Sequence, residues 1–369
     1  MKKKFSIIVV NFFRVTNPYS GASEVSYNFF KNIPIKNKIL FQFSEINQNF
    51  NKVKTIKVNS KIHKILSINK LANLIINFCK KKTNPIIIIE GASWIGYTFI
   101  LYNYLKQKIN NAKFIYHSHN IEFLLRKKKG NFLITFLSKF FEKFVTKNFD
   151  LFTCVSKLDK DLLKKIYKFN AIILRNGIEL PKNIEGIKIK IKKFKYIFFC
   201  GSIDYHLNFE ALNILIKEIM PIVIKLNPKI KLIVSGNNKL PFKNNYLINA
   251  GFVKKNEFYN ILRGASLFIN PMKSGFGSQI KTITALVFGK TIISSKQGVA
   301  GIEINKSFKN LFITNNSKKF ANLIIKNIDA KKIHKKSSYY YKKKYSMNNI
   351  TKDFFKKINR LVGKKSILL

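Results

Sequence analysis

Short apolar runs alternate with longer amphipathic segments through the first half of the chain. Each apolar run predicts a buried strand followed by a polar or glycine-containing turn, and these runs are residues 5–11, 86–90, 113–117, 151–155 and 172–174. Between two of them, Phe132–Asn148 places Phe, Leu and Val on one face and Lys on the other, which predicts an amphipathic helix. Ser156 is placed to cap a further helix that begins near Lys157. This alternation is typical of a parallel sheet covered by helices.

The second half repeats the pattern. It predicts strands at residues 196–200, 231–235, 246–250, 265–269 and 291–294, and helices at 209–226, 257–263 and 278–288. Pro221 should kink or split the first of these helices, because proline removes a backbone hydrogen bond. In open parallel sheets, ligands bind beyond the carboxyl ends of the strands. The chain is therefore expected to be an α/β protein with two Rossmann-like, doubly wound domains facing across a cleft.

We expect the first domain at residues 1–180 and the second at residues 196–345. Residues 181–195 are rich in Lys and lack a core pattern, which indicates a linker.

One stretch, residues 270–301, has the order strand end, glycine loop, helix and strand. Its loop contains Gly275 and Gly277, and a backbone without Cβ can approach a phosphate or a sugar closely. The amide groups that open the following helix direct partial positive charge toward the same loop. This pattern favours an anion site.

The composition excludes a disordered chain, because 46% of the 369 residues are hydrophobic. The formal net charge is +52, yet only five basic residues are Arg, at positions 14, 126, 175, 263 and 360. Nucleic-acid readers usually use Arg for bidentate contacts, so nucleic-acid binding stays open but is not preferred. The Lys residues accompany many Asn, Ile and Phe, which share AT-rich codons. We interpret much of the charge as the result of genomic drift toward AT-rich codons, with the Lys residues on solvated faces. Such a basic surface still attracts anionic lipids and polyphosphates.

The three cysteines, Cys79, Cys154 and Cys200, lie far apart and indicate neither a disulfide framework nor a metal site. They suit a reducing compartment. The apolar run near the N-terminus is short and lacks a cleavage site, so it is expected to be a strand rather than a secretion signal. Polar residues and glycines interrupt residues 86–105, so no transmembrane segment is expected.

Several stretches resemble the family 4 glycosyltransferases. The segments FCGSIDYHLNFEALNILIKEIMP, KLIVSGNN, INAGFV, ASLFINPMKSGFGSQIKTITALVFGKTIIS and QGVAGI resemble the donor-binding half of that family, in order and spacing. NPYSGASE, HSHNIEFLLR, FDLFTCVSKLD and ILRNGIEL resemble its acceptor half. The resemblance implies a two-domain GT-B fold and metal-independent transfer of a sugar from a nucleotide donor, with retention at the anomeric carbon. It also implies that residues 346–369 form a helical segment, with a helix pair in 348–369, that packs back on the first domain.

The resemblance assigns roles to individual residues. His119 would face the sugar as a hydrogen-bonding or proton-relay group, and Lys281 would supply positive charge to the leaving group. Breaking a glycosidic phosphate bond builds negative charge on the diphosphate, which cations and helix amides can stabilise. The remaining donor-binding positions line the phosphates, the sugar and the nucleobase: Gly21, Gly201, Ser202, Gly251, Phe252, Val253, Gly275, Phe276, Gly277, Ser278, Gln279 and Thr284. No metal ligand and no cofactor are expected, since the nucleotide-sugar is a substrate.

The chain departs from the family pattern in the donor half. Related sequences commonly carry Glu at the position of Thr284, where it binds ribose hydroxyls, and often carry Arg at the position of Gln279. The cation that often follows the Gly201 turn is missing, with His206 as the nearest candidate. Losing a ribose carboxylate weakens donor binding by ~1–3 kcal/mol if nothing replaces it. These departures favour a second hypothesis, a non-catalytic GT-B-like binding protein with a degenerate donor site.

Other positions have two interpretations. Lys281 alone would be a solvated helix lysine, and His117 could be a structural histidine whose orientation relative to His119 depends on how the strand end bends. Phe132–Asn148 is either a core-facing helix or, with the preceding Lys run at 127–129, a patch for anionic lipid.

The main hypothesis is an active, cytoplasmic glycosyltransferase, peripheral on the inner face of the membrane. We expect its partners to be a nucleotide-sugar donor, a surface-polysaccharide or lipid-linked glycan acceptor and an anionic membrane surface. A basic nucleic-acid-binding protein is the least favoured alternative.

Overall fold

The computed structural model describes residues 5–363, except residues 19, 48–49, 81, 83, 129, 182–193, 237–238, 276–277 and 330–332. The chain forms two compact units. The first contains Met1–Gly177 together with Met347–Leu369, and the second contains Ile178–Ser346. Most of the expected linker lies outside the described residues.

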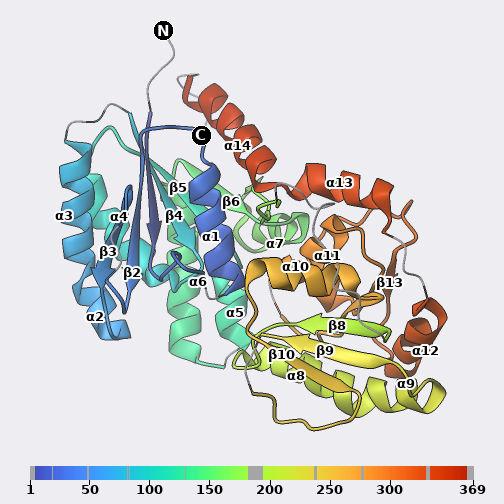
Figure 1. The fold of residues 1–369 in the computed structure, drawn as a ribbon. Coiled ribbons are helices and arrows are strands. Elements are labelled where there is room, and N and C mark those ends of the chain that lie inside the picture. Colours follow the sequence, from blue (N-terminus) through green and yellow to red (C-terminus); the bar gives the residue numbers. More distant parts are fainter. Residues whose placement is uncertain are drawn as a thin grey trace. The chain divides into compact units, whose positions relative to one another are not determined.

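The first unit is built on a parallel sheet with the strand order β3-β2-β1-β4-β5-β6-β7 (Figure 1). Its strands are β1 (Ser6–Asn11), β2 (Lys38–Ser44), β3 (Val53–Lys57), β4 (Pro85–Gly91), β5 (Lys113–Ser118), β6 (Leu151–Cys154) and β7 (Ile172–Ile173). The central strands are buried on both faces, as expected for a parallel sheet between helix layers.

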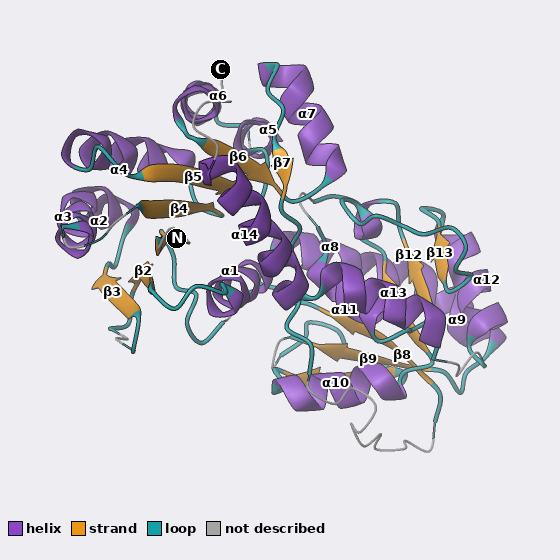
Figure 2. Cartoon of the chain, turned by 90° about the horizontal axis from the view of Figure 1, so that it is seen from above, coloured by secondary structure: helices purple, strands orange, loops and turns teal. Residues whose placement is uncertain are grey.

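Helices cover both faces of this sheet. They are α1 (Gly21–Asn32), α2 (Lys61–Leu66), α3 (Ile68–Cys79), α4 (Ile95–Lys108), α5 (Glu122–Lys128), α6 (Phe132–Asn148), α7 (Lys157–Tyr167) and α14 (Met347–Gly363). Helices α3, α4 and α6 lie on one side of the sheet and α1 and α14 on the other (Figure 2). Ile8 and Val10 of β1 join the core cluster with residues of α3, α4 and α6.

The second unit has a parallel sheet with the order β10-β9-β8-β11-β12-β13. Its strands are β8 (Tyr196–Cys200), β9 (Lys231–Ser235), β10 (Leu247–Gly251), β11 (Leu267–Asn270), β12 (Ile292–Ser294) and β13 (Leu311–Ile313). Its helices are α8 (His206–Ile214), α9 (Met220–Leu226), α10 (Lys255–Gly264), α11 (Ile280–Val287), α12 (Ser317–Asn327) and α13 (Lys335–Tyr345). One core cluster packs under α8, α9 and α12, and another under α10, α11 and α13.

The strand pattern read from the sequence is confirmed in both units, with differences of one or two residues at the ends. The amphipathic helix at Phe132–Asn148 is confirmed at its bounds, and Ser156 caps α7 by accepting from the backbone N–H of Asp159. The helix expected at 209–226 is split as predicted. A π-helical turn, Leu215–Ile219, separates α8 from α9, and Pro221 lies in the first turn of α9, where its missing N–H costs least.

Sequence reasoning missed β2, β3, α2 and α3 in the first unit and β13, α12 and α13 in the second. One reason is visible in β2, where the fully buried Gln42 interrupts the apolar pattern. Its Oε1 accepts from the backbone N–H groups of Val15 and Thr16, and its Nε2 donates to the hydroxyls of Thr16 and Thr55. A buried polar side chain of this kind is stable only because its partners come from other elements, which the local pattern does not reveal.

Two further expectations need correction. The glycine-loop helix begins at Ile280 rather than at Ser278. The C-terminal segment contains one helix in the described residues, α14, and not a helix pair, because its apolar positions keep one helical stripe without a break. This helix packs on α1, and the hydroxyl of Thr351 donates to the carbonyl of Asn32.

The cysteines are free and buried. Over the described part of the chain, no helix combines the length and the apolarity that crossing a membrane would require.

Candidate functional site

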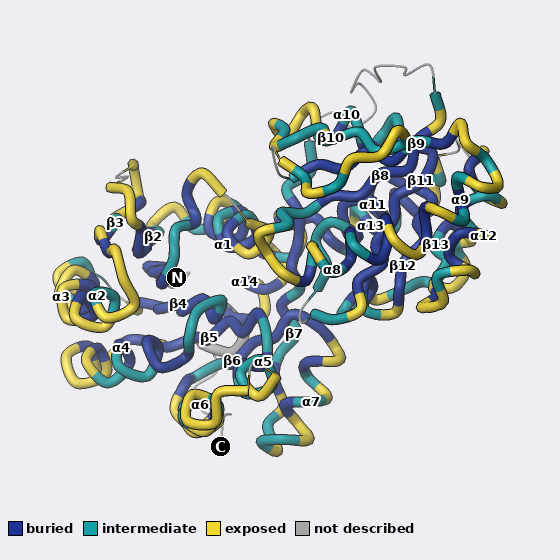
Figure 3. Tube along the Cα trace, turned by 90° about the horizontal axis from the view of Figure 1, so that it is seen from below, coloured by how far each residue is buried: buried dark blue, intermediate teal, exposed yellow. Residues whose placement is uncertain are grey.

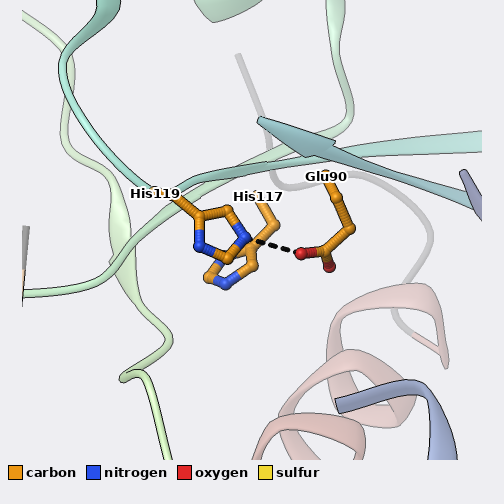
Figure 4. Close-up of side chains that lie close together, drawn as sticks. All are labelled: Glu90, His117 and His119. Atoms are coloured by element: carbon orange, nitrogen blue, oxygen red, sulfur yellow. Dashed lines mark hydrogen bonds and ion pairs between the residues drawn. The ribbon is translucent and has the colours of Figure 1, made fainter. Parts of the chain in front are cut away.

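Two histidines and a glutamate meet at the carboxyl edge of the first sheet (Figure 4). Glu90, near the end of β4, pairs in register with His117 of β5, and His119 follows one residue after β5. The Oε2 of Glu90 lies 2.6 Å from the Nε2 of His119, and the two imidazole rings are 4.7 Å apart. All three side chains are buried. The structure therefore resolves the question left open for His117, which lies beside His119 rather than away from it.

Partners from other elements hold this cluster. Ser26 of α1 donates to the Oε2 of Glu90 at 2.9 Å. The Nδ1 of His117 lies 2.8 Å from the hydroxyl oxygen of Thr153, and that hydroxyl donates to the carbonyl of Tyr116 at 3.3 Å. Since the hydroxyl proton is used there, its oxygen accepts the Nδ1–H of His117, which leaves a lone pair on Nε2.

The surroundings lower the pKa of both Glu90 and His117, with opposite consequences for their charges near pH 7. Burial alone would raise the pKa of Glu90, but the neighbouring histidines and Ser26 outweigh it and lower this pKa, so the carboxylate is ionised. Burial lowers the pKa of His117 to about 4, against the opposing charge of Glu90. His117 is therefore neutral near pH 7.

Ligand atoms of Glu90, His117 and His119 lie within 4.8 Å of one another, a set that could hold a transition-metal ion. The short bond between Glu90 and His119 occupies a carboxylate oxygen and a ring nitrogen that such an ion would need. The arrangement fits a hydrogen-bonded pair better than a metal centre. That the protein needs no metal stays a prediction.

In the second unit, the candidate donor residues gather around the first turn of α8. The Nζ of Lys281 donates to the carbonyl of Cys200 at 3.2 Å and to the Oδ1 of Asn208 at 2.9 Å. The amide nitrogen of Asn208 donates in turn to the carbonyl of Ser202 at 2.9 Å. The structure thus brings Lys281 to the Gly201 turn and adds Asn208 as the link between them.

Glycine is required where these strand-end turns meet. Gly201 and Gly236 follow β8 and β9 with φ of 147° and 133°. A Cβ on Gly201 would lie 2.8 Å from the side chain of Asn208, and one on Gly236 would lie 2.5 Å from the carbonyl oxygen of Gly201. Both positions therefore need the absence of a side chain.

The glycine loop after β11 packs against the same helix turn. The hydroxyl of Ser274 donates to the carboxylate of Glu210 on α8 at 3.0 Å, and the Nε2 of Gln297 donates to the carbonyl of Gly275 at 2.9 Å. Ser278 donates to the carbonyl of Gly301 at 3.4 Å. Phe276 and Gly277 lie outside the described residues.

The positions that depart from the family have ordinary structural partners. Thr284 is buried and its hydroxyl donates to the carbonyl of Ile280, one turn earlier. Gln279 precedes α11 without capping it through its side chain. His206 is an exposed residue in the first turn of α8, with its ring against Tyr205.

The nucleobase and first-unit positions complete the set. Gly251 ends β10 and accepts from the N–H of Gly236, and the next side chain, Phe252, is 69% exposed. Val253 is half-buried. Gly21 opens α1 behind the Ser20 cap, with nothing within 4 Å of an added Cβ, so a ligand could approach its backbone.

Sequence reasoning missed Glu90, Ser26 and Asn208. Glu90 had a visible signal, a carboxylate closing an apolar run at a strand end. Ser26 and Asn208 had none, because each is an ordinary polar residue on a helix.

The model of the family described as glycosyl transferases group 1 matches residues 194–329. No curated protein matches the sequence. The narrower assignment to family 4 stays a prediction.

Solved structures match almost the whole chain. Sucrose-phosphate synthase from Thermosynechococcus elongatus is 11% identical with a TM-score of 0.73, covering 97% of this chain and 99% of that chain. A glycosyltransferase from Rickettsia africae ESF-5 is 17% identical with a TM-score of 0.69, covering 99% and 100%. HepE from Anabaena, in complex with UDP and glucose, is 11% identical with a TM-score of 0.69, covering 95% and 99%. Residues 194–329 of the second unit therefore resemble the glycosyl transferases group 1 family, and the whole chain has the GT-B fold of the solved structures that it resembles.

Proposed function

We propose that this protein is a retaining, metal-independent glycosyltransferase that moves a hexose-type sugar from a nucleotide-sugar onto a surface-polysaccharide or lipid-linked glycan. The observation that carries the proposal is the position of Lys281, within the family match and hydrogen-bonded at the Gly201 turn. Solved neighbours in complex with UDP, UDP-glucose or a fluorinated analogue favour a UDP-sugar as the first donor to test.

In this mechanism the second unit stabilises the leaving diphosphate. The bond between the anomeric carbon and the phosphate oxygen breaks while the acceptor oxygen forms a bond on the same face. The departing phosphate oxygen takes the proton of the acceptor hydroxyl. Lys281 and the amides that open α8 and α11 meet the charge that develops on the diphosphate.

The test is a thermal-shift and calorimetry panel of UDP-, GDP-, ADP- and CMP-sugars. We expect one nucleotide to stabilise the protein and Lys281→Ala to weaken its binding at least tenfold, since a partly buried cation on a diphosphate contributes more than a surface pair. Lys225→Ala, at an exposed position on α9, is the matched control. Binding of no nucleotide, or equal binding by Lys281→Ala, would contradict the proposal.

The alternative is a non-catalytic binding protein. It is favoured by Thr284, whose hydroxyl is used within its own helix and which offers no carboxylate to a ribose. Donor binding without release of the nucleoside diphosphate, with or without glycan acceptors, would support this alternative over the enzyme.

We further propose that the protein works at the cytoplasmic face of an anionic membrane through an α5–α6 surface. Along α6, Phe132, Phe136 and Phe140 recur every fourth residue and are 85%, 61% and 54% exposed. Leu133 beside them is 64% exposed. The buried residues of α6 begin only at Ser138, and Figure 3 colours much of this helix as exposed. The same two helices carry these basic residues: Arg126, Lys127, Lys128, Lys139, Lys143 and Lys147.

An apolar stripe bordered by Lys is the composition that binds at a lipid interface. The test is co-flotation with phosphatidylcholine vesicles with or without phosphatidylglycerol. We expect binding to the anionic vesicles only, and a loss of at least fivefold for the double variant Phe132→Ser/Phe136→Ser. Leu226→Ser, at a 57% exposed position on α9, controls for general loss of surface apolarity. Unchanged flotation of the double variant would rule this surface out.

A further inference from the structure

We infer that Glu90, with Ser26 behind it, is the positioning residue for His119, and that it presents the Nδ1 of His119 to the substrate. The inference rests on the proposed function for the identity of that substrate, a sugar hydroxyl. The geometry behind the inference is independent of the proposed function, because all of its residues lie in the first unit. Figure 4 shows the Nε2 of His119 directed at Glu90 and the other ring nitrogen directed away.

The two nitrogens of His119 have different surroundings. Nε2 is bonded to the carboxylate at 2.6 Å. Nδ1 has no protein hydrogen bond among the described residues, yet it is not one of the fully buried polar atoms that lack a partner. It therefore keeps contact with the outside of the cluster. A ring whose Nε2–H is donated to a carboxylate carries a lone pair on Nδ1 when neutral, and this lone pair can accept from a hydroxyl.

The carboxylate is itself held in one orientation. Its Oε2 accepts a hydrogen bond from the hydroxyl of Ser26 at 2.9 Å and lies 2.6 Å from the Nε2 of His119. The side chain is fully buried. Its Oε1 is buried with no partner among the described residues. Both hydrogen bonds that the carboxylate accepts therefore converge on Oε2, the oxygen that bonds to His119. Glu90 thus orients His119 through a single, doubly bonded oxygen.

His117 completes the arrangement without competing for the carboxylate. Its Nδ1 is bonded to Thr153, and its ring packs 5.9 Å from Phe29 of α1. Because the His117 ring is held in place and lies 4.7 Å from the His119 ring, His119 packs against His117 while it is bonded to Glu90. The cluster holds the imidazole in one orientation before any ligand binds, which is what a hydrogen-bonding group at a reacting sugar needs.

The experiment uses nitrogen-15 histidine labelling of the full chain, which contains five histidines. His119→Gln and His117→Gln assign the ring signals. We expect His119 to show a hydrogen-bonded Nε2–H. Glu90→Gln should abolish the carboxylate-bonded proton signal while the chain stays folded, as the signals of the other histidines report. Ser26→Ala should shift the same signal less, and His63→Gln, at a half-buried position on α2, should leave it unchanged.

The kinetic arm uses the donor identified by binding. We expect Glu90→Gln to lower kcat at least tenfold with the donor KM within twofold, and Glu90→Asp to recover part of the loss. A His119 protonated on Nδ1 with a bare Nε2 would overturn the inference. So would full turnover by Glu90→Gln, or a stoichiometric metal ion in the purified protein that His119→Gln removes. Failure of the donor panel would instead count against the proposed function, since the ring signals report on Glu90 without substrate.

Discussion

Lys281 is a cation whose hydrogen bonds in the described residues go only to uncharged oxygens. It donates to a backbone carbonyl and to the amide oxygen of Asn208, and it lies 4.8 Å above the ring of Phe199. None of these partners neutralises its charge, although each fixes its position. The charge is therefore available to an anion that reaches the Gly201 turn.

This environment predicts a pH dependence of donor binding. Burial lowers the pKa of Lys281 to about 8, with a small opposing effect of Cys200. Below pH 8 the amine is protonated, and a bound diphosphate raises its pKa further. Donor affinity should therefore be constant below pH 8 and weaken up to about tenfold per pH unit above it. Calorimetry from pH 6.5 to 9.5 measures this, and Lys281→Gln should show weak, flat binding. An affinity in the normal protein that does not change up to pH 9.5 would contradict the assignment.

Between elements, the position of His119 depends on how α5 is anchored. Glu142 of α6 accepts from the backbone N–H groups of Glu122 and Phe123, which open α5, and from the hydroxyl of Tyr167 at 2.6 Å. A carboxylate of α6 thus caps the start of α5, which follows closely after His119 in the sequence. The first N–H groups of a helix have no partner within the helix, and in α5 the carboxylate of Glu142 accepts two of them.

The cap predicts a stability effect with a defined sign. Burial raises the pKa of Glu142 from 4.5 to about 7, against the hydrogen bonds of Tyr167 and the two backbone groups. Because the folded state binds this proton more tightly, the stabilisation is complete below pH 4.5 and is lost as the pH rises through 7. The free energy of unfolding relative to Glu142→Gln should fall by on the order of 3 kcal/mol over that range. Urea unfolding at several pH values measures it, and a difference independent of pH would contradict the prediction.

At the scale of the whole chain, the first unit is completed by residues that come last in the sequence. Helix α14 packs on α1, with the ring of Phe354 6.2 Å from that of Phe29. Phe29 in turn lies 5.9 Å from His117. The C-terminal helix therefore supports the helix that carries Ser26 and the back of the histidine cluster.

Removing this support should destabilise the first unit. Phe354 is buried, so Phe354→Ala should cost about 3–5 kcal/mol of unfolding free energy through lost burial and a cavity. Lys352→Ala, at an exposed position on the same helix, should change it by less than about 0.5 kcal/mol. Denaturant unfolding followed by His117 and His119 ring signals measures both. Equal effects of the two substitutions would show that α14 does not support the unit.

Local sequence determined most elements and the general position of the sites. The apolar runs, the Ser156 cap, the Pro221 break and the glycines after strands act over a few residues, so their structural consequences can be read from neighbours in the chain. Parallel strands also place their carboxyl ends at one edge. His119 lies there directly after β5, and Lys281 on α11 reaches the turn after β8, while the roles given to both stay predictions.

Only the tertiary structure decided which polar groups meet. Glu90 reaches His119 because β4 and β5 are neighbours in register, and Ser26 reaches Glu90 across 64 residues of sequence. Asn208 and Lys281 meet across 73 residues. These contacts depend on strand order and helix placement, which local patterns do not specify. The residues therefore determine the elements and the edges where chemistry can occur, and the packing of distant segments determines which side chains carry it.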